Sequence, residues 1–386
     1  MLKAQTAFTQ ELDDPKAAAA EILSQLELGA LLKNSVGIIT FYQDAHESGV
    51  LEAIAGALPF DTVGCTVLSG GTQSGFGFEQ ISVAVLSSDD LKFSAAVSEK
   101  LTYENAEEAS RACYRDALSR LGGEPSLILA FGPITRDISG NRYTIALDDE
   151  SGGVPIFGTL SNTGIVYEDA RVAYNGYVER MLLSLILVSG DAKPRFYTRA
   201  ISDSNITKRG AIITQSDGYL LQKINDASVQ DYLFSIGVVT VEGGATASLP
   251  ILVDYKDGTR PTAYSMYANT DKGMLVGGPV PVGAEIAFAD VDYDSVMSTA
   301  EDALTTLTAD LEKDGASIAF IIPCLSRCLT LGAQSEDEMR KTAERLRARV
   351  PYLFMYSGGE ICPVPGAGGR LVNRFHNLTY TAMTLG

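Results

Sequence analysis

Short apolar runs separated by polar segments recur along the whole chain. Runs such as 36–41, 127–131 and 318–322 are rich in branched apolar residues, and their length is typical of buried strands. Between such runs, apolar residues recur at helical spacing. In 296–311 they fall on one stripe, which predicts an amphipathic helix. The pattern therefore predicts a protein of mixed helix and strand content.

Capping residues mark where several of the helices begin. Asp14 precedes Pro15, and Pro is well suited to the first helical position. Asn105 with Glu108, and Ser335 with Glu338, have the spacing of a capping box. The predicted helices cover residues 15–29, 48–57, 105–121, 226–235, 296–315 and 335–350. The predicted strands cover residues 36–41, 62–67, 81–86, 91–97, 127–131, 195–201, 219–224, 249–253, 262–266, 285–289, 318–322 and 352–356.

Other segments have weaker patterns. Residues 172–188 are interpreted as one long strand or a strand pair, and two last strands carry Glu360 and His376. The glycine-rich stretch 69–75 is interpreted as a flexible hairpin loop, since it has neither the lysine nor the helix start of a phosphate-binding loop. Residues 132–150 are interpreted as a polar connector.

The order of elements is similar in the two halves of the chain. Each half runs strand, helix, three strands, long helix and strand, and the polar run 202–205 lies between them. This order predicts two related α+β domains, residues 1–202 and 203–386, that arose by internal duplication. Each would have a mixed sheet with helices packed on the outside. Because no Gly-x-Gly-x-x-Gly motif opens a helix, a dinucleotide-binding fold is not expected.

Composition narrows the function classes. A hydrophobic content of 46% and a charged content of 20% are typical of a globular protein. The net charge of −18 disfavours binding to nucleic acid. No apolar run is long enough to span a bilayer, so we expect no membrane insertion. Five cysteines, an odd number spread widely, indicate a reducing compartment, and we expect a cytoplasmic protein.

Polar residues gather at the ends of three apolar runs near the C-terminus. Cys324 and Arg327 follow one run, Glu360 follows the next, and His376 with Asn377 begins the last. If these runs are neighbouring strands, their polar ends converge on one site.

Each of these residues has a binding role and a structural role. The Arg327 guanidinium suits a carboxylate or phosphate ligand, or it forms an ion pair, for example with Glu360. Glu360 holds a ligand ammonium, acts as a general base, or has only a structural partner. His376 contacts ligand, or is satisfied by the backbone.

The same region contains the residue types of a metal site. Cys324, Cys328, Cys362 and His376 are the ligand types that zinc prefers. Their spacing lacks a second closely spaced pair, so we expect neither a metal nor another cofactor. A Cys324 nucleophile partnered by His376 is the covalent alternative.

These C-terminal motifs resemble those of the FIST family, whose members combine a FIST N and a FIST C domain. The similar segments there are Cys324 to Arg327, Gly359 to Pro363 and His376 to Thr379. In the first half, Val63 to Thr66 and Gly152 to Gly158 resemble family elements. The acidic residue that follows the first of these in the family is missing here, because Val67 to Gly70 replace it.

The resemblance implies a sensory module that binds a small ligand such as an amino acid. Family members are often fused to output domains. Because this chain has no residues left over for one, we expect it to act on a signalling partner in trans. The alternative is an enzyme that uses Glu360, His376 and Cys324. The predicted ligand-binding residues are Arg327, Glu360, His376, Asn377, Cys324, Tyr356, Gly153, Pro155, Cys65 and Thr66.

Overall fold

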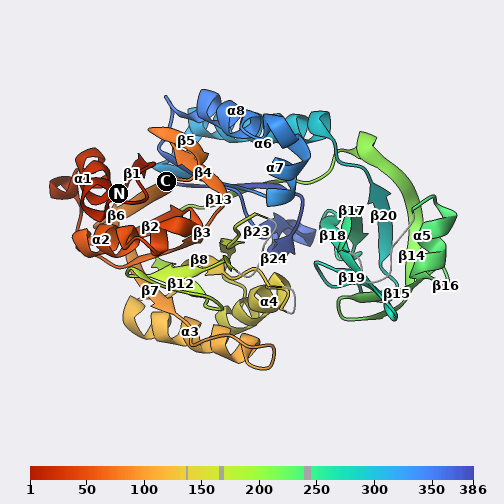
Figure 1. The fold of residues 1–386 in the computed structure, drawn as a ribbon. Coiled ribbons are helices and arrows are strands. Elements are labelled where there is room, and N and C mark those ends of the chain that lie inside the picture. The colour runs from red at the N-terminus through yellow and green to blue at the C-terminus, as the bar shows by residue number, and fades with distance from the viewer. Residues whose placement is uncertain (136–137, 165–168, 239–244) are drawn as a thin grey trace.

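The computed structural model describes residues 1–386 except 136–137, 165–168 and 239–244. In the described part, three six-stranded sheets form the body of the protein, and a separate barrel projects from it (Figure 1). The α+β class with mixed sheets is therefore confirmed.

The three body sheets share one plan. In each, two parallel strands lie side by side, and an antiparallel strand flanks the first of them. The first unit has β2 (Asn34–Phe41), β3 (Thr62–Thr66) and β6 (Ile81–Ser88). The second has β8 (Pro125–Gly132), β9 (Ile156–Leu160) and β12 (Ser184–Ser189). The third has β21 (Ile318–Pro323), β22 (Tyr352–Met355) and β25 (Tyr380–Leu385). Strand pairing therefore shows three repeated units, whereas the sequence predicted a duplication of two halves.

Each unit donates a β-hairpin to the sheet of another unit. The hairpin β4 (Ser69–Thr72) with β5 (Gly75–Phe78) joins the third sheet through β22. The hairpin β10 (Val172–Tyr174) with β11 (Tyr177–Glu179) joins the first sheet through β3. The hairpin β23 (Glu360–Pro365) with β24 (Leu371–His376) joins the second sheet through β9. The exchange closes a ring, so no unit completes its sheet alone.

One further strand lies at the edge of each sheet, and helices cover the outer faces (Figure 1). The edge strands are β1 (Leu2–Thr9), β7 (Lys92–Val97) and β13 (Arg195–Arg199). The helices are α1 (Pro15–Gln25), α2 (Val50–Ala57), α3 (Ala106–Leu121), α4 (Gly140–Ser151), α6 (Tyr293–Asp314), α7 (Leu325–Leu331) and α8 (Asp337–Leu346). On their inner faces the three sheets share one core, with residues such as Val36, Leu129 and Phe320.

The barrel is inserted into the third unit, between β13 and α6. Its ring of antiparallel strands closes because β14 pairs with both β15 and β20. The barrel strands are β14 (Ile206–Asp217), β15 (Leu220–Ile224), β17 (Ala245–Asp254), β18 (Thr262–Thr270), β19 (Gly273–Val276) and β20 (Glu285–Ala289). The short β16 (Ala227–Ser228) and α5 (Val229–Ser235) follow β15.

Several sequence predictions need correction. The stretch 69–75 forms the buried β4–β5 hairpin and is not a loop. Residues 172–188 form β10, β11 and β12, which belong to two different sheets. The supposed connector 132–150 contains α4, whose cap Ser139 accepts a hydrogen bond from the Asn141 amide. Strand β1 and helix α7 were not predicted.

Strand pairing crosses the proposed division between residues 202 and 203. The hairpin β4–β5 precedes it and pairs with β22, while β23 follows it and pairs with β9. The division into domains of residues 1–202 and 203–386 stays a prediction.

Glycine permits the close approach of the parallel strands in two units. A Cβ atom on Gly64 would overlap the Ile39 carbonyl oxygen, and one on Gly158 would overlap that of Ala130. We expect Gly64→Ala to lower the free energy of unfolding by about 1–3 kcal/mol, because the strands must separate. The control is Gly56→Ala in α2, where nothing lies near the added methyl group. Urea unfolding measures both, and equal stabilities would contradict the packing argument.

Candidate functional site

The three units meet where their second parallel strands end. The same backbone hydrogen bond occurs in each unit at this point. The N–H donor lies in the loop that follows the second parallel strand, and the carbonyl acceptor lies at the end of the first parallel strand. The bonds are Val67 N–H to Phe41 O at 2.9 Å, Ser161 N–H to Gly132 O at 2.7 Å, and Ser357 N–H to Pro323 O at 2.8 Å. The repetition identifies equivalent positions in the three units.

Links between the units are equivalent in two places and different in the third. The backbone N–H of Asn162 donates to Thr66 O at 2.9 Å, and the backbone N–H of Gly358 donates to Leu160 O at 2.8 Å. In the third place the side chain of Asn162 intervenes. Its Nδ2 donates to Tyr356 O at 2.6 Å, and its Oδ1 accepts from the Leu68 amide at 3.0 Å. Asn162 belongs to the second unit, and its side-chain amide bonds to the third unit and to the first, so it joins all three. The residue is fully buried.

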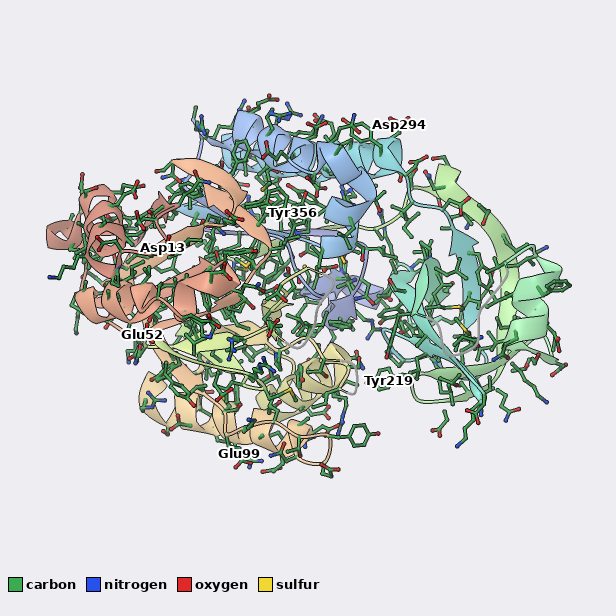
Figure 2. All side chains as sticks on the ribbon, viewed as in Figure 1. Asp13, Glu52, Glu99, Tyr219, Asp294 and Tyr356 are labelled. Carbon is green, nitrogen blue, oxygen red and sulfur yellow. The ribbon has the colours of Figure 1, made fainter. Side chains whose placement is uncertain are left out.

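Two predicted residues, Thr66 and Tyr356, therefore lie together at the junction, and Figure 2 shows Tyr356 in the middle of the body. Asn162 is a site residue that was not predicted. A signal was present, because Ser161 and Asn162 are polar residues that follow the run 156–160, as Cys324 to Arg327 follow the run 318–322.

Glu360 begins β23 and is completely buried. The Thr379 hydroxyl donates to its Oε2 at 2.7 Å, while Oε1 has no hydrogen-bond partner within the described part of the chain. Burial raises the pKa of the Glu360 carboxyl to about 8. Burial and the nearby Glu360 charge also raise the pKa of the Cys324 thiol. At pH 7 both groups are therefore mainly protonated, which does not suit Glu360 to an ion pair with a ligand ammonium.

Arg327 lies in α7 and is 1% exposed. Its Nε and Nη2 donate to Glu338 Oε1 at 2.9 and 2.6 Å, so its ion-pair partner is Glu338 and not Glu360. Its Nη1 donates to Thr299 Oγ1 at 3.0 Å, and its Nη2 donates to Val296 O at 2.7 Å. These contacts tie α7 to α8 and α6. The prediction of a capping box formed by Ser335 and Glu338 is wrong, because no side-chain hydrogen bond caps α8.

His376 ends β24 directly opposite Glu360 in the strand register. Its Nε2 lies 3.0 Å from the Cys362 carbonyl oxygen, which can only accept, so Nε2 carries the proton. Burial lowers the pKa of His376 to about 4, and the ring is therefore neutral at pH 7. Its Nδ1 then has a free lone pair. His376 also lines a pocket.

The other predicted residues lie elsewhere. The backbone N–H of Asn377 donates to the carbonyl oxygen of the barrel residue Ala263 at 3.0 Å. Gly153 and Pro155 precede β9, at the end of that strand opposite the junction. Cys65 is buried in the core that the three sheets share. The predicted residues therefore do not form one site. They lie at the junction, in a buried cluster of Glu360, Cys324 and Thr379, at the pocket, and elsewhere in the body.

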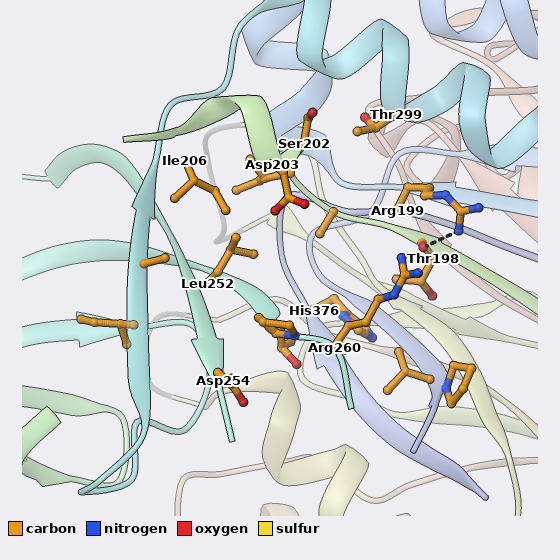
Figure 3. Close-up of a pocket in the computed structure, with 18 of the residues that line it drawn as sticks. Thr198, Arg199, Ser202, Asp203, Ile206, Leu252, Asp254, Arg260, Thr299 and His376 are labelled. Atoms are coloured by element: carbon orange, nitrogen blue, oxygen red, sulfur yellow. Dashed lines mark hydrogen bonds between the residues drawn. The ribbon is translucent and has the colours of Figure 1, made fainter. Parts of the chain in front are cut away.

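The pocket has a volume of about 930 Å³ and lies between the barrel and the third unit. On the body side it is lined by β13 and the residues after it, by α6, and by β23 and β24 (Figure 3). On the barrel side it is lined by β14, β17, β18 and β20. Its basic residues are Arg199, Arg209 and Arg260, and its acidic residues are Asp203, Asp254, Glu285 and Asp302.

Most of these charged groups already have partners. Arg209 pairs with Asp203 at 3.1 Å, and Lys256 bridges Asp254 and Glu285. Arg199 donates to Thr198 O and to a hydroxyl of α6. Arg260 is exposed and makes no ion pair or hydrogen bond with the residues that the structure describes. The buried Thr262 hydroxyl also lines the pocket and lacks a partner within that same part of the chain.

Two family models match most of the chain. The FIST N domain matches residues 35–227 and the FIST C domain matches residues 227–363. The chain belongs to the FIST family. FIST domains are generally taken as small-ligand sensory modules. No curated protein matches the sequence. Within the described residues, no helix has the length and apolar character needed to cross a membrane.

Two solved structures have a distant likeness to the fold. A cyanuric acid hydrolase from A. caulinodans is 10% identical, with 100% of this chain and 99% of that chain covered and a TM-score of 0.38. A second structure, described as "Cyanuric acid hydrolase: evolutionary innovation by structural concatenation", is 10% identical, with 75% of this chain and 100% of that chain covered and a TM-score of 0.30. At these TM-scores the likeness extends to neither activity nor substrate.

Loss of the Asn162 amide should destabilise the whole body. Asn162→Ala leaves the buried Tyr356 carbonyl without a partner, at about 1–3 kcal/mol, and the half-buried Leu68 N–H loses its acceptor as well. Asn162→Asp keeps the shape and the acceptor but loses the donor, so we expect it to be destabilised as well at pH 7. Urea unfolding measures both variants. A loss below about 0.5 kcal/mol for Asn162→Ala would contradict the role of this amide.

The raised pKa of Glu360 predicts a pH dependence. In the unfolded chain the carboxyl has its ordinary pKa of 4.5, whereas in the folded protein its pKa is about 8. Its contribution to stability is therefore complete below pH 4.5 and is lost as pH rises through 8, at up to about 1.4 kcal/mol per pH unit. Glu360→Gln removes this loss. We expect its unfolding free energy, relative to wild type, to increase from pH 5 to pH 8, and a constant difference would refute the assignment.

Proposed function

We propose that this protein binds a small polar metabolite, an amino acid or a similar carboxylate, in the pocket between the barrel and the third unit. The observation that supports the proposal most directly is Arg260, a pocket-lining guanidinium without a partner among the described residues. A guanidinium presents a planar fork of N–H donors that suits a carboxylate.

Other groups of the pocket complement the rest of an amino acid. Neutral His376 offers the Nδ1 lone pair to an N–H or O–H donor of the ligand, and the Thr262 hydroxyl offers one further hydrogen bond. Asp302 supplies a negative charge on α6 for an ammonium group. Ile206 and Leu252 of the barrel form an apolar wall for a side chain. The set suits a ligand with both charges and an apolar part.

Of the residues selected from the sequence, we propose His376 as a ligand contact. Arg327 and Glu360 then have supporting roles. Arg327 holds Thr299, which lines the pocket, and Glu360 lies beside His376 in the strand register. Their buried positions favour support over direct contact.

A sensory module requires a protein that responds to it, and we propose a signalling partner that acts in trans. Helix α6 is the element best suited to relay binding. It lines the pocket at Thr299 and Asp302, and Arg327 connects it to α7 and α8 on the outer face of the third unit.

The enzyme alternative receives less support. Cys324 is buried with a raised pKa, and neighbouring Glu360 is mainly protonated at pH 7, so neither group is poised as nucleophile or base. Among the described residues, no hydrogen bond joins His376 to Cys324. Ligand binding without turnover is therefore the function we propose.

Calorimetric titration with the twenty L-amino acids and small carboxylates tests the proposal. We expect at least one of them to bind, and Arg260→Gln to weaken that binding by about tenfold or more, since a charge-assisted pair is lost. Arg180→Gln is the control, because Arg180 is paired with Asp169 and does not line the pocket. Wild-type affinity in Arg260→Gln would refute the assignment of the site.

A further inference from the structure

One wall of the pocket is formed by consecutive residues. Thr198, Arg199, Ala200, Ile201 and Ser202 all line it, and Asp203, which lines it as well, begins a 3-10 helix. Side chains of an extended segment point alternately to opposite faces. A cavity that touches successive residues of such a segment therefore faces its edge, where the backbone N–H and C=O groups lie.

This edge is unoccupied in the sheet. Strand β13 is the terminal strand of its sheet and pairs with β25 on one side only. The two residues that follow, Ala200 and Ile201, make no backbone hydrogen bond with any residue that the structure describes. Both are half-buried. Since backbone polar groups that lose water need partners, this segment is suited to bind another backbone.

The pocket is also large for a free amino acid. Its volume of about 930 Å³ approaches the upper end of the range for drug-sized ligands, about 300–1,000 Å³. A single amino acid would leave most of this space to water. A ligand of several residues would fill it.

We propose that the natural ligand is a short peptide of about three to five residues that binds in extended form along Ala200 and Ile201, as an added strand. This inference rests on the proposed function. At about 3.3 Å per residue such a peptide spans roughly 10–17 Å. In the view of Figure 3, the Arg260 side chain extends toward Thr198 and Arg199, where it can receive the C-terminal carboxylate. Main-chain hydrogen bonds supply affinity, and Ile206 and Leu252 face the peptide side chains.

A pooled library of tripeptides with free termini, compared with the twenty free L-amino acids, tests the ligand class. Thermal shift identifies binders and calorimetry measures their affinities. We expect the best tripeptide to bind at least about tenfold more tightly than any free amino acid. Methylation of its backbone nitrogens, one at a time, should weaken binding by about tenfold or more at one position or several, because the methyl group removes a donor.

Two proline variants test the wall itself. Ala200→Pro and Ile201→Pro each remove one backbone N–H, and adjacent N–H groups point to opposite sides of an extended segment. We expect at least one of them to lose about tenfold in peptide affinity, while Ala200→Val and Ile201→Val, which keep the N–H, change it little. Circular dichroism confirms that each variant is folded. If the proline variants do not fold, the methylated peptides still test whether the protein binds the backbone of the peptide.

The outcomes separate the two proposals. Suppose free amino acids bind as tightly as any tripeptide, or methylation changes nothing, while Arg260→Gln weakens binding. The peptide inference is then overturned and the pocket remains a small-ligand site. If neither peptides nor amino acids bind, or if Arg260→Gln has no effect on what binds, the site assignment fails and the inference fails with it.

Discussion

The amide of Asn162 is the contact on which the arrangement of the three units depends. Each unit sends a loop to the junction, and backbone hydrogen bonds join the second unit to the first and the third to the second. A third backbone bond of this kind is replaced by the two hydrogen bonds of the Asn162 side chain. Asn162 and Tyr356 are fully buried and Leu68 is half-buried, so loss of the bond to Tyr356 leaves an unpaired polar group that water does not reach.

Exchange of hairpins carries the effect of this junction to the rest of the molecule. The hairpin β23–β24 leaves the third unit at the junction and completes the sheet of the second unit. It brings Glu360 and His376 with it, one toward the buried cluster and the other toward the pocket. The positions of both residues therefore depend on contacts between units.

The inserted barrel supplies what the repeated units lack. The pocket lies where the barrel faces the edge strand β13 and helix α6 of the body. Arg260 comes from the barrel and His376 from the exchanged hairpin. Binding at this boundary would stabilise one relative position of barrel and body. Arg327 connects α6, through its bonds to Thr299 and Val296, with α8, through its ion pair with Glu338.

The sequence by itself determined the elements whose signals are local, namely α1 with its Asp14 cap, α6 with its apolar stripe, and the short apolar strands. Helix α3 is also present, but the capping box predicted at Asn105 is wrong, because the Asn105 side chain makes no cap hydrogen bond. The sequence also identified the family and placed Glu360 and His376 at strand ends. Only the tertiary structure decided which strands pair, because the partners of β4, β10 and β23 belong to other units, far away in the sequence. It likewise assigned Glu338 to Arg327, and it alone formed the pocket. Such contacts depend on which segments meet in space, and local patterns carry no information about that.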